Sequence, residues 1–354
     1  MVVSSKWVIH FFTIHTYTCL NEPHKQSPFV SETIVFPRSL TFNNFIESKT
    51  QNMIQKAMYF LFITAVILPG CESKKAAVVF QTDFGLKDGA VSAMKGVAMG
   101  VSDELNLFDL THEIPAYNIW EAAFRLQQTA PYWPAGTVFV SVVDPGVGTS
   151  RRSIVLKSKS GQYFVSPDNG TLTLIAESTG IESIREIDEN LNRRVGSADS
   201  YTFHGRDVYA YTGARLAAGI IKYEQVGGLL NNDSLVKISY PKPVIQKDSI
   251  LGTIPVLDIQ YGNVWTNIPA SLLKLQGIKA GDSLRITIYN QEELVHSAGY
   301  RFVHTFGEVG RGQSMAYLNS LLNLSIAINE GNLSDSLGVK SGPGWRVVVW
   351  KVSR

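Results

Sequence analysis

Short apolar runs alternate with amphipathic stretches through the middle of the chain. Ala76–Gln81 and Val138–Val143 are short, mostly apolar runs of strand length, typical of strands buried on both faces, and Leu105–Leu110 is expected to be a further strand between them. Between them, apolar residues recur at helical spacing in Asp88–Val101 and Ile119–Ala130. This alternation predicts an α/β domain with a mainly parallel sheet and helices on both of its faces.

The pattern changes in the second half of the chain. A hairpin-like pair and a helix at Gly205–Ala218 still follow the Val138 strand, but beyond Tyr240 short β-rich runs separated by turn residues dominate. Such runs are typical of a small β-barrel or sandwich. We therefore expect an N-terminal α/β domain over 76–243 and a smaller C-terminal all-β barrel domain over 244–354. The β-rich runs are Ile250–Ile259, Leu284–Tyr289, Ser325–Ile328 and Arg346–Val352.

The N-terminal part carries a separate apolar segment. Ala57–Leu68 has 12 residues, whereas a helix needs about 20 to span a bilayer. With Lys56 before it and Leu68-Pro-Gly-Cys71 after it, the segment resembles a bacterial lipoprotein signal, in which the cysteine becomes lipidated. We expect a signal peptide at 53–71, anchoring to the cell envelope through Cys71, and a non-native or disordered extension at 1–52. The alternative is a short buried segment in a cytoplasmic protein.

Composition and charge narrow the class of protein. The chain has 354 residues, of which 45% are hydrophobic and 18% charged, which suits one large or two modest globular domains. A net charge of +2 without a basic stripe argues against a nucleic-acid partner. The cysteines are Cys19 and Cys71, so a chain beginning at Cys71 would hold no disulfide and no cysteine metal cluster.

A shaped loop follows the Val138 strand. Asp144-Pro-Gly and Gly148 predict a tight turn at the carboxyl edge of the sheet, where open α/β sheets bind ligands. Arg151 comes seven residues after Asp144 and can fold back onto it. The alternative is a purely structural turn held by this ion pair.

Two other loops carry candidate chemistry. Asp83 ends the first strand, where a carboxylate can bind both hydroxyls of a ribose or cap the following helix. His204 lies just before a helix, and together with Asp144 and Arg151 it would form a polar constellation able to orient and polarise a water. The alternative for His204 is a local hydrogen-bonding role. His112 is expected to be structural.

Motifs for metals and phosphates are missing from the sequence. It contains no HxH, HxxxH or HExxH spacing, and an arginine beside Asp144 would oppose a cation. The first strand is followed by neither a P-loop nor a dinucleotide-binding glycine pattern, and there is no GxSxG elbow. We therefore expect neither a catalytic metal nor a cofactor.

Seven motifs together carry a family resemblance. In this order along residues 76–354, they resemble the S-adenosyl-L-methionine hydroxide adenosyltransferase family, relatives of the fluorinating and chlorinating enzymes. They are Thr82-Asp-Phe-Gly85, Asp109-Leu-Thr-His-Glu-Ile-Pro115, Pro134-Ala-Gly-Thr-Val-Phe139, Asp144-Pro-Gly-Val-Gly148, Ser166-Pro-Asp-Asn-Gly170, Phe203-His-Gly-Arg-Asp207 and Gly262-Asn-Val-Trp-Thr-Asn267.

The resemblance implies hydrolysis of S-adenosyl-L-methionine, as substrate and not cofactor, to adenosine and L-methionine. It implies a homotrimer whose sites lie between one subunit's N-terminal domain and its neighbour's C-terminal domain. The only membrane contact that we expect is the lipid anchor inferred from the signal pattern. By position, the family's water-activating set falls on Asp144, Arg151 and His204. The implied substrate contacts are Asp83 at the ribose, Tyr117 as a wall, Asp258 near the methionine ammonium, Asn263 and Ile328 at the adenine, and Ser320 near the methionine carboxylate.

Departures from the relatives bear on the nucleophile. The halogenating relatives carry an aromatic residue at Asp144, a tyrosine–serine pair at His204-Gly205 and an inserted loop absent between Ser160 and Tyr163, so all three differences favour water over halide. The run at 322–325 stands where many members of the family have a Gly-aromatic-Leu-Glu run. The resemblance therefore says least about the end of the pocket that would bind the methionine carboxylate. For Asn263 the alternative is a turn residue, and Trp265 is expected to be a core aromatic. The alternative functions are a non-catalytic nucleoside-binding lipoprotein and an enzyme using another nucleophile or donor.

Overall fold

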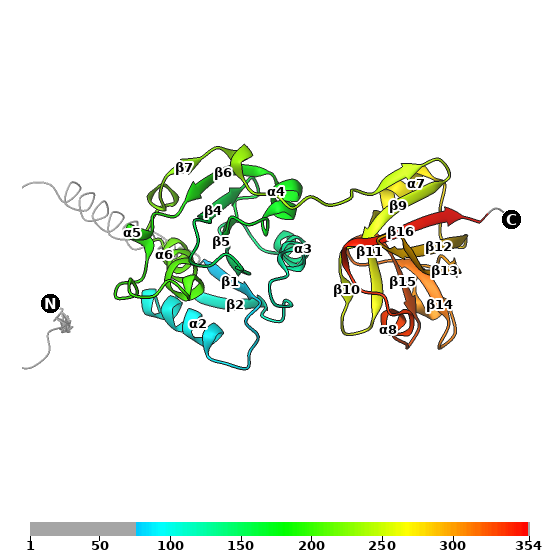
Figure 1. Ribbon diagram of the computed structural model, residues 1–354, viewed down its shortest axis with the longest axis horizontal. Helices are drawn as coiled ribbons and strands as arrows, with labels where there is room; N and C mark the ends of the chain where they lie inside the picture. Colours follow the sequence, from blue (N-terminus) through cyan, green and yellow to red (C-terminus); the bar gives the residue numbers. More distant parts are fainter. Residues whose placement is uncertain (1–75, 353–354) are drawn as a thin grey trace, which may run out of the picture. The chain divides into compact units, whose positions relative to one another are not determined.

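The computed structural model describes residues 76–352 (Figure 1). The chain divides into two units, 1–71 and 72–354, and the architecture below is that of the second. The predicted extension, signal peptide and lipidation site at Cys71 lie outside the described residues. Within residues 76–352, none of the helices has both the length and the apolar character needed to cross a membrane.

A seven-stranded mixed sheet forms the first half of the described chain, in the order β2-β1-β3-β5-β4-β6-β7. The first four strands of that order pair in parallel. β5 and β4 pair antiparallel as the predicted hairpin, and the pairs β4–β6 and β6–β7 are also antiparallel. The strands are β1 (Ala77–Thr82), β2 (Asn106–Thr111), β3 (Val138–Val142), β4 (Ser153–Ser158), β5 (Tyr163–Pro167), β6 (Ile181–Glu186) and β7 (Leu229–Leu230).

Helices cover both faces of this sheet, which confirms the predicted α/β class. Along β3, Val138 and Val140 pack with α2, η2 and α6, whereas Phe139 packs with α3 and α4 on the opposite face. Every residue of β3 is buried. The helices are α2 (Ala90–Val101), α3 (Ile119–Thr129), η1 (Ala130–Tyr132), α4 (Thr173–Thr179), α5 (Glu189–Asn192), η2 (Gly205–Ala210), α6 (Tyr211–Ala217), η3 (Tyr223–Gln225) and η4 (Asn232–Ser234).

The predicted helix over 205–218 begins with a π-helical turn, η2, before continuing as α6. Its register brings Gly213 against β3, where an added Cβ would lie 2.6 Å from Val140 Cγ2. This close approach seats η2 and α6 tightly on the sheet, and with them His204, which immediately precedes η2.

The second half is mainly β, as predicted, with the short helices α7 and α8, and its antiparallel ladders form two sheets instead of one closed barrel: β10-β11-β15-β14 and β13-β12-β16-β9-β8. Side chains from both sheets share one core, among them Val264 and Ile326 from the first and Ile286 and Val349 from the second. The elements are β8 (Val244–Gln246), β9 (Ser249–Ile254), β10 (Leu257–Asp258), β11 (Asn263–Pro269), α7 (Ala270–Leu275), β12 (Ser283–Asn290), β13 (Glu293–Arg301), η5 (Phe306–Glu308), β14 (Ser314–Leu318), β15 (Asn323–Ile328), α8 (Leu333–Leu337) and β16 (Gly342–Lys351).

Helix α3 contacts the start of the β-rich half directly. Trp120 Nε1 donates a hydrogen bond to the carbonyl of Pro255 at 2.8 Å. Next to it, Phe124 packs in a buried cluster with Val256 and Trp265. Trp265 is thus the core aromatic that the sequence led us to expect.

Candidate active site

The Asp144–Arg151 pair forms as the loop spacing predicts. Arg151 Nη2 donates to Asp144 Oδ2 at 2.6 Å, and the side chains are 10% and 5% exposed. The other guanidinium nitrogen, Nη1, donates to Ser153 Oγ at 3.0 Å, and the guanidinium lies 5.6 Å from the centre of the Tyr209 ring. A buried charge needs partners of this kind, and Arg151 is fixed by several at once.

His204 lies in the same cluster and is held from its Nε2 side. Arg193 Nη2 is 3.2 Å from His204 Nε2, and Glu189 Oε2 lies 3.7 Å from the same nitrogen. Glu189 and Arg193 are themselves ion-paired, and Ser153 Oγ donates to Glu189 Oε1 at 3.3 Å. Sequence reasoning missed Glu189 and Arg193, although their i, i+4 spacing across the short helix α5 was a readable sign of a pair.

Four polar side-chain atoms of this cluster are buried without a hydrogen-bond partner anywhere in residues 76–352. They are Asp144 Oδ1, His204 Nδ1, Arg151 Nε and Arg193 Nη1. A buried polar atom costs free energy when it is unpaired, so several of them together indicate a site for a small polar molecule such as water.

Burial sets the charge states of both groups. It raises the pKa of the Asp144 carboxyl above its usual 3.8, and the attraction of Arg151 offsets this only in part. Burial also lowers the pKa of His204 below its usual 6.5, against the opposing charge of Glu189. The imidazole is therefore neutral at neutral pH, while the carboxylate is a stronger base than an ordinary aspartate.

Asp83 and Tyr117 meet at the same edge of the sheet. The Tyr117 backbone N–H donates to Asp83 Oδ2 at 2.8 Å, and Tyr117 itself adopts a left-handed φ of 67° with its side chain 72% exposed. Non-glycine residues in this conformation cluster at ligand sites and also occur in exposed turns, as at Gln291. Asp83 does not cap the following helix. Gly89 is the N-cap of α2, and the Ala90 N–H donates to Asp88 Oδ1.

The predicted C-terminal contacts gather around one cavity of about 720 Å³. Asp258, Asn263, Ser320 and Ile328 all line it. Asn263 Nδ2 donates to Asp258 Oδ2 at 3.0 Å, so these two side chains orient each other. A cavity of this size suits a nucleoside-sized ligand.

Asn319 also lines this cavity and was missed from the sequence. Its Oδ1 accepts from the backbone N–H groups of Leu321 and Asn323, while its Nδ2 is buried without a partner among the described residues. In the segment that follows, Leu322 is exposed and has a left-handed φ of 58°.

The structure brings the predicted residues together in two groups. Asp144, Arg151 and His204 form one cluster in the α/β half, with Asp83 and Tyr117 paired on neighbouring loops; the other group lines the cavity of the β-rich half. Within residues 76–352, no hydrogen bond or ion pair joins the two groups.

His112 has a different role from His204. Its Nδ1 is 2.8 Å from Thr82 Oγ1 and its Nε2 is 2.9 Å from Asp109 Oδ1, so both ring nitrogens have partners inside the sheet edge. In the described part of the chain, no group of three or more His, Cys, Asp or Glu side chains is placed to hold a metal ion.

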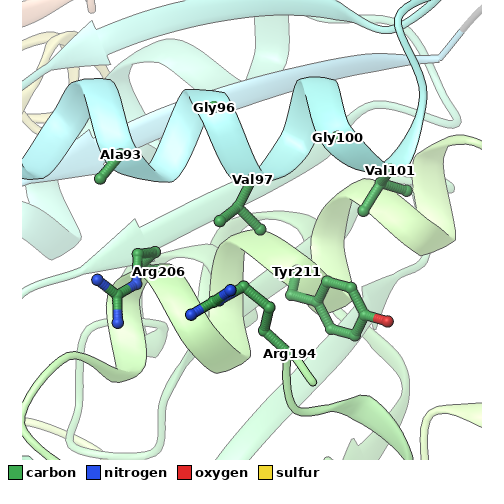
Figure 2. A pocket seen from close by; sticks show the side chains of 8 residues that line it. All are labelled: Ala93, Gly96, Val97, Gly100, Val101, Arg194, Arg206 and Tyr211. Atoms are coloured by element: carbon green, nitrogen blue, oxygen red, sulfur yellow. The ribbon is translucent and has the colours of Figure 1, made fainter. Parts of the chain in front are cut away.

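A second hollow of about 500 Å³ lies between α2 and the start of η2 and α6. Figure 2 shows Val97 pointing from α2 toward Arg194, Arg206 and Tyr211. Both arginines pair with the buried carboxylate of Asp207, whose pKa is lowered because these hydrogen bonds outweigh its burial. Because the arginine charges already have a partner and α2 offers only small apolar residues, this hollow lacks the reactive groups of the Asp144 cluster.

Comparison with known proteins agrees with this geometry. Residues 78–227 match the model of the SAM hydroxide adenosyltransferase N-terminal domain, and residues 252–346 match that of the C-terminal domain. The chain belongs to this family. It is 36% identical over 272 residues to an (R)-S-adenosyl-L-methionine hydrolase of Salinispora tropica, covering 76% of this chain and 97% of that protein.

Two further relatives mark the range of the family. A fluorinase of an Actinoplanes species is 29% identical over 290 residues, covering 75% of this chain and 95% of the fluorinase. A solved structure of an uncharacterized conserved protein from Thermotoga maritima superposes with a TM-score of 0.71 at 36% identity, covering 77% of this chain and 99% of that one.

Proposed function

We propose that the protein hydrolyses S-adenosyl-L-methionine to adenosine and L-methionine, with water attacking C5′. The observation that carries this proposal is the buried Asp144–Arg151 pair beside His204, with Asp144 Oδ1 and His204 Nδ1 unpartnered. The family membership and the hydrolase relatives support the same substrate.

The leaving group of this reaction needs little assistance from the protein. A sulfonium departs as a neutral thioether, so no general acid is needed. The difficulty is water, whose pKa of about 15.7 makes it a poor nucleophile. The cluster would hold one water in line with the C5′–S bond and provide a proton acceptor beside it, which combines positioning with general base catalysis.

The substrate would be held by groups on both halves of the chain. Asp83 would bind the ribose hydroxyls with Tyr117 as a wall, Asp258 would face the methionine ammonium, and Asn263 would read the adenine. Ser320 lies next to Asn319, whose free Nδ2 offers a donor to the methionine carboxylate in the segment that departs from the relatives.

Water is favoured over halide by charge. The Asp144 carboxylate, with 5% of its side chain exposed, would lie beside the proposed nucleophile, where it would repel chloride or fluoride but accept a hydrogen bond from water. Fluorinases are among the relatives, so the choice of nucleophile needs its own test.

Purified protein incubated with S-adenosyl-L-methionine in high chloride should release adenosine. His204→Ala should lower turnover strongly and leave substrate affinity nearly intact, whereas Asp83→Ala should mainly weaken binding. Titration calorimetry beside single-turnover rates separates the two effects. A 5′-chloro nucleoside as the main product would overturn the choice of water, and equal losses of binding in both variants would favour a nucleoside-binding protein.

We also propose a homotrimer in which one subunit's Asp144 cluster meets a neighbour's C-terminal cavity. It is supported by the absence, among the described residues, of any hydrogen bond or ion pair joining the two groups within one chain. Neither group alone provides both a nucleophile site and a full set of substrate contacts.

For localisation, we propose attachment to the bacterial cell envelope through a lipid on Cys71. The support is the Lys56–Cys71 sequence pattern alone. Cys71→Ser should leave an uncleaved precursor without lipid label. Wild-type protein found in the cytosol with residues 1–52 attached would overturn this proposal.

A further inference from the structure

The contact with Arg193 determines which ring nitrogen of His204 carries the proton. Its Nη2 is 3.2 Å from His204 Nε2, and a guanidinium carries only N–H donors. The imidazole nitrogen facing it must therefore be the acceptor. In a neutral imidazole one nitrogen carries the proton and the other the lone pair, so an accepting Nε2 leaves the proton on Nδ1.

The competing arrangement would place a proton on Nε2 facing Glu189. Glu189 Oε2 lies 3.7 Å from Nε2, too far for a hydrogen bond, and this carboxylate is already paired with Arg193. The Arg193 guanidinium is itself fixed, since it lies 4.5 Å from the centre of the Tyr201 ring and its side chain is 9% exposed. Burial also lowers the pKa of His204, which favours the neutral ring.

On the other side of the ring, the donor and acceptor match a water molecule. His204 Nδ1 is buried without a partner in the described chain, and so is Asp144 Oδ1. Arg151 occupies the other carboxylate oxygen, Oδ2, at 2.6 Å. A chain of contacts links the two groups. Arg151 donates to both Asp144 Oδ2 and Ser153 Oγ. Ser153 Oγ in turn donates to Glu189 Oε1, and Glu189 Oε2 lies 3.7 Å from His204 Nε2.

We propose that Arg193 holds His204 in the neutral tautomer protonated on Nδ1, so that His204 donates a hydrogen bond to the attacking water and Asp144 Oδ1 takes the water's proton. Arg193 is a positioning residue, because it acts through His204. The proposal rests on the proposed function for its catalytic meaning, but the tautomer itself is a property of the protein without substrate.

The step is balanced. An O–H bond of the water breaks and its proton passes to Asp144 Oδ1, while the oxygen forms a bond to C5′. The C5′–S bond breaks and its electron pair stays on sulfur, which releases neutral methionine thioether and adenosine. The proton on Asp144 then passes to solvent, and His204 neither gains nor loses a proton.

Nitrogen-15 NMR of histidine-labelled protein tests the tautomer directly, with His204 assigned by its loss in His204→Gln. In the wild type at neutral pH, Nδ1 should be protonated and Nε2 unprotonated. Arg193→Met should raise the population protonated on Nε2, and Arg193→Lys, which still only donates, should keep the wild-type tautomer. The matched control is Arg194→Met, since Arg194 pairs with Asp207 and does not contact the imidazole. A wild-type ring protonated on Nε2 would overturn the proposal.

Turnover measurements test the proposed roles of Arg193, Asp144 and His204. Arg193→Met should lower kcat about tenfold, the scale of one hydrogen bond, and change KM little. Asp144→Asn should lower kcat by about 10²–10⁴, as expected for a lost proton acceptor. His204→Gln keeps an N–H donor and should retain more turnover than His204→Ala. If His204→Gln is as inactive as His204→Ala while Asp144→Asn stays active, His204 is the proton acceptor and the proposal is wrong. If no form releases adenosine, the proposed function fails, and with it the catalytic role, whatever the NMR shows.

Discussion

The proposed chemistry requires particular charge states of Asp144 and His204. The carboxyl has to be ionised and the imidazole neutral, and protonation removes both states as the pH falls. Burial raises the pKa of Asp144 above 3.8 and lowers that of His204 below 6.5, so the two shifts move toward each other. The charged groups that modulate them are Arg151, Arg193 and Glu189.

We therefore expect kcat/KM to fall on the acid side of neutral pH, with a midpoint above the 3.8 of an ordinary aspartate. A pH series of initial rates measures it. The Asp83→Ala variant is the control, because it should change the height of the profile and not the midpoint. A midpoint at or below 3.8 would contradict a buried Asp144 whose pKa is raised.

Leu322 stores backbone strain in the exposed turn between β14 and β15. Its φ of 58° suits glycine and disfavours leucine, and its side chain is 63% exposed, so little burial would be lost on replacement. Leu322→Gly should raise the free energy of unfolding by about 1 kcal/mol. Denaturant titration measures it, with Leu294→Gly on strand β13 as the control expected to lower stability. A loss of stability in Leu322→Gly would show that the turn depends on the leucine side chain.

At the residue scale, the sequence predicted contacts that are local. Asp144 and Arg151 could be paired in advance because a turn with proline and glycines joins them over seven residues. The contact of Arg193 with His204 could not, because it depends on how the loop between them folds back. Asp83 satisfies the Tyr117 N–H instead of a helix end because α2 begins only at Ala90, later than the sequence pattern indicated.

At the element scale, apolar periodicity located the first three strands, the hairpin and the helices α2, α3 and α6 to within a few residues, but it missed α4, α5, β6 and β7. It did not reveal that the helix after His204 opens with a π-helical turn, since a single wider turn leaves the apolar spacing of 205–218 almost unchanged. It also overstated the parallel character of the sheet, because β6 and β7 add antiparallel pairs beyond the recognised hairpin.

The close packing of α6 against β3 gives a prediction at this scale. Gly213→Ala places a Cβ 2.6 Å from Val140 Cγ2, so we expect a loss of about 1–3 kcal/mol in the free energy of unfolding. The matched control is Gly96→Ala in α2, where nothing lies within 4 Å of the added Cβ and stability should rise by about 0.5–1 kcal/mol. Equal effects in the two variants would mean that α6 is free to shift.

At the scale of the whole molecule, the proposed trimer predicts complementation between inactive subunits. His204→Ala disables the Asp144 cluster, and Asp258→Ala with Asn263→Ala disables the cavity. Co-expressed in equal amounts, the two chains should recover about a quarter of the wild-type sites, since each site draws its two halves independently from neighbouring subunits. Doubly tagged, co-purified complexes exclude the two inactive homotrimers, so about a third of their sites should be active, and their turnover measures this. Activity no greater than the sum of the separate variants would place each complete site within one chain.

The buried contact between α3 and the start of the β-rich half bears on how the protein unfolds. Trp120 bonds to Pro255, and Phe124 shares a buried cluster with Val256 and Trp265, so the apolar interior continues from one half into the other. Separating the halves would expose these side chains to water and leave the Pro255 carbonyl without its donor. Melting of residues 76–352 is thus expected to be a single cooperative event, and a protease nick in the exposed stretch near Pro241 would leave two fragments that stay associated until heated.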